Sequence, residues 1–249
     1  MDLRLADTVY VVTGGSAGLG YATARALVDD GARVVISSRS AEKVADAVAS
    51  LGEDRAAGLP ADLAAEDTAE RLVALARERY GRLDGALVSV GGPPSSTAAR
   101  ATDEQWRAAF ESVFLGGVRC ARVVANALVD GGAIGMVLST SARSPIPGLG
   151  ISNGLRPGLA MVIKDMADEY GQRGVRLFGL LPGRIATDRM VQLDAGNPAV
   201  GDAARAAIPL GRYGEPDEFG RTAAFLLSPA AGYVTGSMIP VDGGALRCP

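Results

Sequence analysis

Short apolar runs alternate with amphipathic segments along the chain, and this alternation constrains the fold more than any other feature. The runs are mostly apolar and often β-branched, and they cover residues 8–13, 33–38, 83–90, 133–139 and 175–181. Near-continuous apolar runs of this length are typical of strands that are buried on both faces of a parallel sheet.

Between the runs lie segments whose apolar residues recur every three or four positions, which is the spacing of one helix face. These segments cover residues 19–30, 41–51, 66–80, 103–129 and 159–170. A strand–helix succession with short connections predicts a doubly wound α/β sheet with helices on both faces. Such sheets bind ligands beyond the carboxyl ends of their strands.

The 249 residues show no change of composition, internal repeat or low-complexity linker that would divide them. We therefore expect one domain over residues 1–249. Residues 188–200 form an irregular stretch after a strand end, with Gly196 and Pro198. This stretch is either a plain surface loop or part of a lid over the site, at about residues 188–208.

Charge and composition exclude several kinds of partner. The formal net charge of −3 argues against a basic face for nucleic acid or anionic lipid. Two cysteines are too few for a disulfide framework or a four-thiolate zinc site. No apolar run approaches the ~18 residues of a membrane span, and the first residues lack the pattern of a signal peptide. We expect a cytoplasmic protein without a metal, nucleic-acid or membrane partner.

The sequence contains no histidine, which excludes Ser-His-Asp and Cys-His nucleophiles and imidazole bases. This matters because Gly150-Ile-Ser152-Asn-Gly154 matches the G-x-S-x-G nucleophile elbow of hydrolases. Residues 146–150 contain a proline and two glycines rather than a buried strand. We interpret the match as a chance one, since a hydrolase built on Ser152 would need a base other than histidine.

The segment Thr13-Gly14-Gly15-Ser16-Ala17-Gly18-Leu19-Gly20 follows the first apolar run and opens the first helical segment. Glycines let the backbone turn tightly, and the N–H groups and positive dipole end of the helix then face an anion. In this position the segment predicts a dinucleotide pyrophosphate site. A tight strand–helix turn without a ligand is the alternative.

The spacing T-G-x-x-x-G-x-G resembles that of the short-chain dehydrogenase/reductase family, and further motifs extend the resemblance over nearly the whole chain. They include Asp62 in Ala-Asp-Leu, the stretch Pro182-Gly183-Arg-Ile185-Ala-Thr187, and C-terminal motifs in residues 209–216 and 234–244 that are similar to bacterial 3-oxoacyl-carrier-protein reductases. The resemblance implies a single Rossmann-type sheet of about seven strands and a small carbonyl or alcohol substrate. It also implies a homo-oligomer, tetramer or dimer, built through helices at about 103–129 and 152–170 and through the C-terminal strand.

The end of the second run indicates which nicotinamide cofactor is preferred. An acidic residue there would bind the ribose of NAD and repel a 2′-phosphate. The chain has Ser37-Ser38-Arg39 instead, and a hydroxyl beside a guanidinium suits a phosphate. This predicts NADP(H) in preference to NAD(H), unless Arg39 is only a solvated charge before the next helix.

The resemblance implies that Asp62 accepts a hydrogen bond from the adenine amino group, although an aspartate that caps a turn would look the same. The full set of cofactor contacts that it implies is Gly14, Ser16, Ala17, Gly18, Leu19, Gly20, Ser38, Arg39, Asp62, Leu63, Gly91, Arg156, Pro182, Gly183, Ile185 and Thr187.

For catalysis the resemblance implies an Asn-Ser-Tyr-Lys set, with the tyrosine and lysine four residues apart on one helix face. The chain departs from this set. Its lysines, Lys43 and Lys164, follow Arg39 and Ala160 at that spacing. Alignment puts Ser141 at the family serine, Ser152 and Arg156 at the tyrosine and lysine positions, and Val113 at the asparagine position.

A serine hydroxyl is shorter and less acidic than a phenol, and arginine does not lose its proton at neutral pH. Two hypotheses follow. One is an NADPH-dependent carbonyl reductase with Ser141 as polariser, Ser152 with a water as proton source and Arg156 as ribose clamp. The other is a catalytically silent NADP(H)-binding sensor or partner subunit. A tyrosine from elsewhere, such as Tyr213, would restore the ordinary chemistry. Pro157 is expected in the first turn of its helix.

Overall fold

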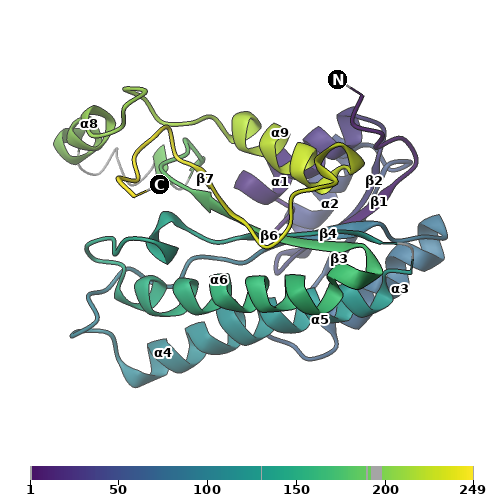
Figure 1. The fold of residues 1–249 in the computed structure, drawn as a ribbon, viewed down its shortest axis with the longest axis horizontal. Helices are drawn as coiled ribbons and strands as arrows, with labels where there is room; N and C mark the ends of the chain where they lie inside the picture. Colours follow the sequence, from purple (N-terminus) through teal and green to yellow (C-terminus); the bar gives the residue numbers. More distant parts are fainter. Residues whose placement is uncertain (1, 130, 189, 192–197, 249) are drawn as a thin grey trace.

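A single parallel sheet of seven strands forms the centre of the protein (Figure 1), in a computed structural model that describes residues 2–129, 131–188, 190–191 and 198–248. The strand order is β3-β2-β1-β4-β5-β6-β7. The strands are β1 (Val9–Thr13), β2 (Arg33–Ser38), β3 (Ala56–Pro60), β4 (Gly85–Ser89), β5 (Gly132–Val137), β6 (Val175–Pro182) and β7 (Met238–Val241). This arrangement confirms the predicted doubly wound fold of one domain.

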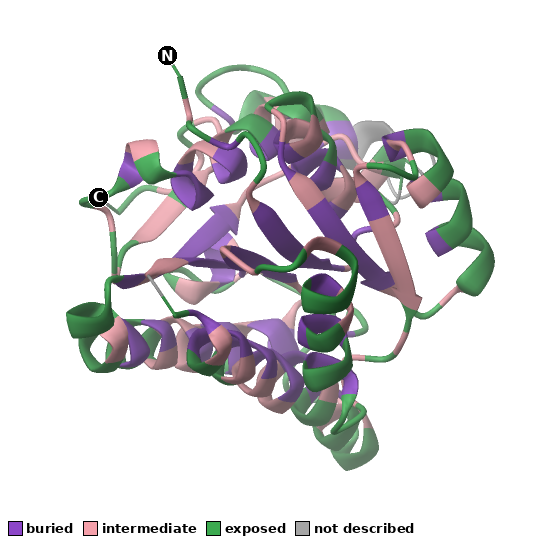
Figure 2. Cartoon of the chain, turned by 90° about the vertical axis from the view of Figure 1, so that its right-hand side faces the viewer, coloured by how far each residue is buried: buried purple, intermediate pink, exposed green. Residues whose placement is uncertain are grey.

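Helices cover both faces of the sheet (Figure 1) and enclose a separate apolar core on each. One face carries α1 (Gly18–Asp29), α2 (Ala41–Leu51) and α9 (Pro216–Leu227); the other carries α3 (Thr68–Tyr80), α5 (Gly116–Ala127) and α6 (Gly150–Tyr170). The central strands are buried on both sides, as Figure 2 shows, and every residue of β1 is buried. This two-sided burial is the reason that their sequences read as continuous apolar runs.

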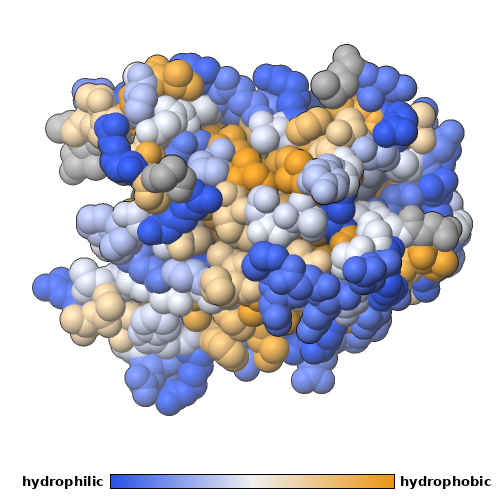
Figure 3. Space-filling model, in the orientation of Figure 1, coloured by the Kyte–Doolittle hydropathy of each residue, from blue (hydrophilic) through white to orange (hydrophobic). Residues whose placement is uncertain are grey.

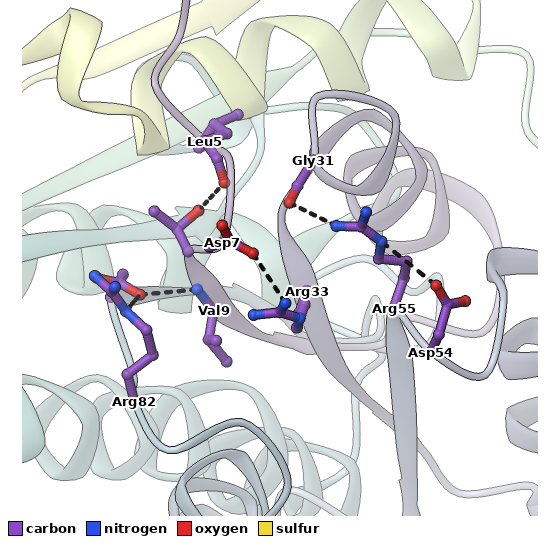
Figure 4. A network of polar contacts seen from close by, with 10 residues as sticks. Leu5, Asp7, Val9, Gly31, Arg33, Asp54, Arg55 and Arg82 are labelled. Carbon is purple, nitrogen blue, oxygen red and sulfur yellow. Dashed lines mark hydrogen bonds and ion pairs between the residues drawn. The ribbon is translucent and has the colours of Figure 1, made fainter.

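Polar contacts tie the strands together at the end of the sheet where they begin (Figure 4). Arg33 pairs with Asp7 at 2.9 Å, and Asp84 accepts from the backbone N–H of Val9 at 2.8 Å while pairing with Arg82 at 2.6 Å. Arg55 donates to the carbonyl of Gly31 at 3.0 Å. These charged side chains already pair with one another or with the backbone. We therefore expect a ligand site at the opposite end of the sheet, beyond the carboxyl ends of the strands.

Edge elements were the ones that apolar patterning did not predict. β3 reads Ala-Ala-Gly-Leu-Pro and is mostly half-exposed, and β7 is half-exposed or exposed throughout. An edge strand has one neighbouring strand and less cover, so its sequence carries no continuous apolar signal. The family resemblance, rather than periodicity, implied these two strands.

Two helical predictions were wrong in detail. Residues 103–129 do not form one helix, because α4 (Asp103–Ala109) passes into a π-helical segment, η1 (Phe110–Leu115), before α5. α6 begins at Gly150, so Pro157 lies inside it and not in its first turn. An interior proline costs about 3 kcal/mol. The helix continues across it because Ile151, Leu155 and Leu159 all pack on the sheet.

The expected lid lies partly outside the described residues, which do not include 189 and 192–197. The irregular stretch was predicted to reach residue 200, but α8 (Pro198–Ala206) already begins at Pro198. In the parts of the chain that the structure describes, no helix combines the length and the apolar character needed to cross a membrane.

Candidate functional site

The turn between β1 and α1 can be made only with glycine at several positions. Gly14 and Gly18 have φ values of +60° and +56°, and a Cβ on Gly14 would lie 2.8 Å from the carbonyl oxygen of Ser89. A Cβ on Gly20 would lie 2.3 Å from the carbonyl oxygen of Gly14. Ala17 is the N-cap of α1, and its side chain cannot accept from the first N–H groups of the helix. Leu19 lies in this uncapped first turn, which is suited to bind an anion.

A cleft of about 560 Å³ opens at the carboxyl ends of β1, β2 and β4. Of the residues predicted to bind a cofactor, Gly14, Ser38, Arg39, Asp62, Leu63 and Gly91 line it. In Figure 3 the surface is hollowed between α8 and the loops beyond the strand ends.

Sequence reasoning missed part of the cleft wall. Thr13 and Ser89 line the cleft and are joined by two hydrogen bonds of 2.9 Å. The Thr13 hydroxyl donates to the carbonyl of Ser89 and accepts from its N–H. Glu104 and Gln105 of α4 line its far wall. One signal could have identified Thr13 and Ser89. Thr13 is the last residue of β1 and Ser89 is the last residue of β4, and these two strands are neighbours in the sheet.

The end of β2 presents hydroxyls and one cation to the cleft. Ser16 donates to Ser38 at 2.8 Å, and Arg39 is exposed. None of the ion pairs between described residues involves Arg39. Ser40, the next residue, caps α2 by accepting from the N–H of Lys43 at 3.3 Å. The carboxylate of Asp62 accepts from the N–H of Ala64 at 3.0 Å, so it caps a turn and also faces the cleft.

The segment after β6 approaches the glycine turn from the other side. The methyl group of Thr187 lies 3.6 Å from the point where a Cβ on Gly18 would stand. Pro182 ends β6, and the N–H of Gly183 donates to the carbonyl of Val241 at 3.0 Å. Ile185 instead lines a separate hollow of about 140 Å³. Thr187 is therefore the residue of this segment that faces the turn.

Ser141 and Ser152 meet in a buried pair, with 3.0 Å between their hydroxyl oxygens. Ser141 lies in a 3-10 turn, η2 (Thr140–Ala142), after β5, and Ser152 lies in the first turn of α6. Because the latter is preceded by a loop rather than a strand, it is not at a strand-to-helix nucleophile elbow. Arg156, one helical turn further, donates to the carbonyl of Val137 at 2.8 Å.

The Arg156 guanidinium is a buried cation, and none of the ion pairs between described residues includes it. Only 4% of the residue is exposed, and its Nε finds no hydrogen-bond partner among the described residues. Burial lowers the pKa of Arg156 to about 10, which leaves it protonated at neutral pH. A buried charge with incomplete hydrogen bonding is costly, so such groups commonly mark sites that a ligand completes.

The three residues do not line the cleft, since Ser141, Ser152 and Arg156 are 3%, 6% and 4% exposed. They nevertheless lie beside its inner end. Ser89, in the cleft wall, is the register partner of Val137, whose carbonyl binds Arg156. The guanidinium is thus bound one strand away from the cleft wall.

Neither Val113 nor Tyr213 supplies a proton donor beside Ser141 and Ser152. Val113, which stands at the family asparagine position, lines the cleft with an apolar side chain. The hydroxyl of Tyr213 accepts from Arg184 at 3.3 Å and donates to the carbonyl of Gly201 at 3.4 Å. Its described contacts lie with the segment that leads to and from α8, not with the serine pair. Among the described residues there is also no group of three or more potential metal ligands.

The known proteins that this chain resembles include several reductases, which it matches over nearly its whole length. The sequence profile of the family described as "Enoyl-(Acyl carrier protein) reductase" matches residues 14–245. Levodione reductase of Leifsonia aquatica is 34% identical over 97% of this chain and 95% of its own. A 3-oxoacyl-[acyl-carrier-protein] reductase of Synechocystis sp. is 32% identical over 96% and 97%. The crystal structure of L-sorbose reductase from Gluconobacter frateurii, complexed with NADPH and L-sorbose, is 28% identical, covers both chains completely and has a TM-score of 0.93.

Proposed function

Because the chain belongs to the short-chain dehydrogenase/reductase family, we propose that it is an NADP(H)-dependent carbonyl reductase, acting on a 3-oxoacyl or other ketone substrate through an atypical Ser-Ser-Arg active site. The observation that carries the proposal is the hydrogen-bonded Ser141–Ser152 pair beside the inner end of a cleft that begins at a glycine turn. That pair retains two hydroxyl donors for a carbonyl oxygen where the family uses a serine and a tyrosine.

The residues present fit the cofactor at several points. The uncapped start of α1, with Gly14, Ser16 and Gly18, would hold the pyrophosphate. Ser38 and Arg39 would hold the 2′-phosphate, and Asp62 and Leu63 would hold the adenine. Arg156, whose Nε has no hydrogen-bond partner among the described residues, would hold the nicotinamide ribose. The remaining contacts in this proposal are Gly91 and the segment with Pro182, Gly183, Ile185 and Thr187. The bound cofactor would supply a hydride.

The protein's own contribution is polarisation of the carbonyl. Ser141 donates a hydrogen bond to the carbonyl oxygen, and Ser152, 3.0 Å away, is positioned to donate a second or to relay a proton from water. Arg156 holds a positive charge nearby in a desolvated place, where charge acts more strongly than in water.

The proposal predicts that Ser141→Ala slows carbonyl-dependent NADPH consumption at least about 100-fold, the usual effect of losing one donor to a developing oxyanion. NADPH affinity should not change. The measurement is loss of nicotinamide absorbance with a panel of β-ketoesters, ketosteroids and quinones. Ser237→Ala, the same change at an exposed serine before β7, is the control and should retain full activity.

A second candidate function, an NADP(H)-binding sensor or partner subunit, is favoured by the burial of the trio outside the cleft. The same assay separates the two. Wild-type protein that binds NADPH but consumes none above the no-enzyme rate with any carbonyl of the panel would overturn the reductase and leave the binding module.

The coenzyme preference gives a second prediction. Arg39→Asp removes a guanidinium that suits a phosphate and puts a negative charge in its place, so NADPH affinity should fall about 10- to 100-fold. NADH affinity should hold or improve. Fluorescence titration with both reduced dinucleotides measures the ratio. Arg100→Asp makes the same charge change at an exposed residue that does not line the cleft, and equal losses in both variants would contradict a phosphate site at Arg39.

The proposal includes a homo-oligomer, dimer or tetramer, formed through α4, α5 and α6. Val113 and Met166 are buried in the protein's own core, but Phe110 and Met161 are 43% and 70% exposed. Phe110 also stacks on Phe114 with ring centres 5.2 Å apart. These exposed apolar side chains lie on the helices through which family resemblance implies subunit contacts.

A further inference from the structure

The positive charge of Arg156 forms no ion pair among the described residues, and the mechanism described so far uses it only to polarise a carbonyl from nearby. A ribose hydroxyl would satisfy its hydrogen-bonding capacity but carries no charge. The strands beside it, β4 and β5, contain no charged residue, and neither does η2. On α6 the next charged side chains, Lys164 and Asp165, are exposed, and Lys164 pairs with Asp168.

Two further features favour negative charge at the same place. Ser152 lies in the first turn of α6, at the positive end of the helix dipole. The hydroxyls of Ser141 and Ser152 can both donate to one oxygen, because each is within 3.0 Å of the other. Two donors, a dipole end and a fixed cation are thus brought together beside the inner end of the cleft, and none of the ion pairs between described residues includes Arg156.

None of the described elements β4, β5 and η2, which lie around this place, contains an acid that could protonate a strongly basic oxyanion. An alkoxide from a simple ketone is the conjugate base of a hydroxyl about as weakly acidic as water, with a pKa of about 16. A phenolate is far less basic, since a phenol has a pKa of about 10. Fixed charge and hydroxyl donors are sufficient to hold a phenolate without protonating it.

We propose that Ser141, Ser152 and Arg156 form a binding site for a delocalised oxyanion, and that the substrates of this reductase are quinones, whose reduced form is a phenolate. This inference rests on the proposed function, because NADPH is the reductant. Hydride adds to the ring carbon β to the held carbonyl, the ring C=C pair shifts, and the carbonyl π pair moves onto the held oxygen. The adduct then tautomerises: the ring carbon that received the hydride loses a proton, and the second carbonyl oxygen gains one. The product is the hydroquinone monoanion. The last proton comes from water after release.

The test uses p-nitrophenol, whose phenolate absorbs visible light, as a probe that needs no turnover. At a pH one unit below the probe's own pKa, wild-type protein is expected to raise the phenolate-to-phenol ratio of bound probe at least about tenfold, the effect of one charge-assisted hydrogen bond. Arg156→Met should abolish this increase, and Arg156→Lys should restore part of it. Replacing a buried charge by an apolar residue of similar volume is commonly tolerated by the fold. Ser152→Ala gives a second variant in which the cation remains, and it should weaken the increase.

Each outcome decides one claim. Absence of phenolate enrichment, or equal enrichment by wild type and Arg156→Met, overturns the oxyanion site. If NADPH binds and β-ketoesters are reduced at least as fast as quinones, the reductase stands and the quinone assignment fails. If the phenolate binds but fluorescence titration finds no NADPH binding, the oxyanion site stands while the proposed function and the quinone assignment that rests on it both fail.

Discussion

Gly20→Ala is expected to abolish dinucleotide binding and to destabilise the protein by about 2–3 kcal/mol, the cost of overpacking a tight contact. The added Cβ would lie 2.3 Å from the carbonyl oxygen of Gly14, 2.8 Å from its carbonyl carbon and 3.2 Å from the backbone nitrogen of Gly15. All three are backbone atoms, so the turn itself must move. Calorimetric titration with NADPH and thermal unfolding measure the two losses.

Gly171→Ala is the matched control for this variant. It makes the same chemical change after the last turn of α6, where φ is −57° and a Cβ would meet no atom within 4 Å. It should change stability by less than about 1 kcal/mol and leave NADPH affinity as in the wild type. Unchanged affinity in Gly20→Ala would show that the turn does not hold the pyrophosphate, and the reductase and the sensor would both lose their basis.

The glycine turn could be predicted from the sequence because all its determinants are local. A buried strand, three spaced glycines and a helix start follow one another between Val9 and Gly20. The far wall of the cleft was different. Glu104 and Gln105 reach it from α4, and which helix faces the strand ends depends on the packing of the whole layer. Nothing in their own neighbourhood signals a ligand.

For the buried residues Ser141, Ser152 and Arg156, too, the sequence predicted one part of the site and not another. Alignment indicated Ser141, Ser152 and Arg156, but the 3.0 Å contact of the serines and the Arg156 Nε without a hydrogen-bond partner among the described residues are properties of the folded chain. A sequence shows which carboxylates exist, not which of them lie far from one guanidinium. Pro157 was placed at a helix start by its local preference, and packing on both sides of it prevailed.

Arg176→Met is expected to lower the free energy of unfolding by about 3–5 kcal/mol, because it removes a partly buried cation and leaves several backbone acceptors without their donor. Its guanidinium donates to four carbonyls, those of Leu226, Leu227, Ser228 and Val234, at 2.9–3.3 Å. Three of them belong to the end of α9 or to the residue that follows it, and the last turn of a helix leaves its carbonyls without intrahelical partners. Methionine fills the space of the side-chain stem but leaves these acceptors unsatisfied.

The expected melting temperature is lower by about 6–20 °C for a chain of this size. Arg119→Met is the control, because Arg119 makes one described hydrogen bond, to the carbonyl of Ala64 at 3.2 Å, and it should cost about 1 kcal/mol. Equal losses in the two variants would mean that the four contacts of Arg176 act no more strongly than one. A larger loss in Arg176→Met, with NADPH affinity retained below the transition, would show that β6 supports α9 through this one side chain. Burial lowers the pKa of Arg176, but an arginine stays protonated throughout the physiological range, so the difference between the variants should not depend on pH between about 6 and 9.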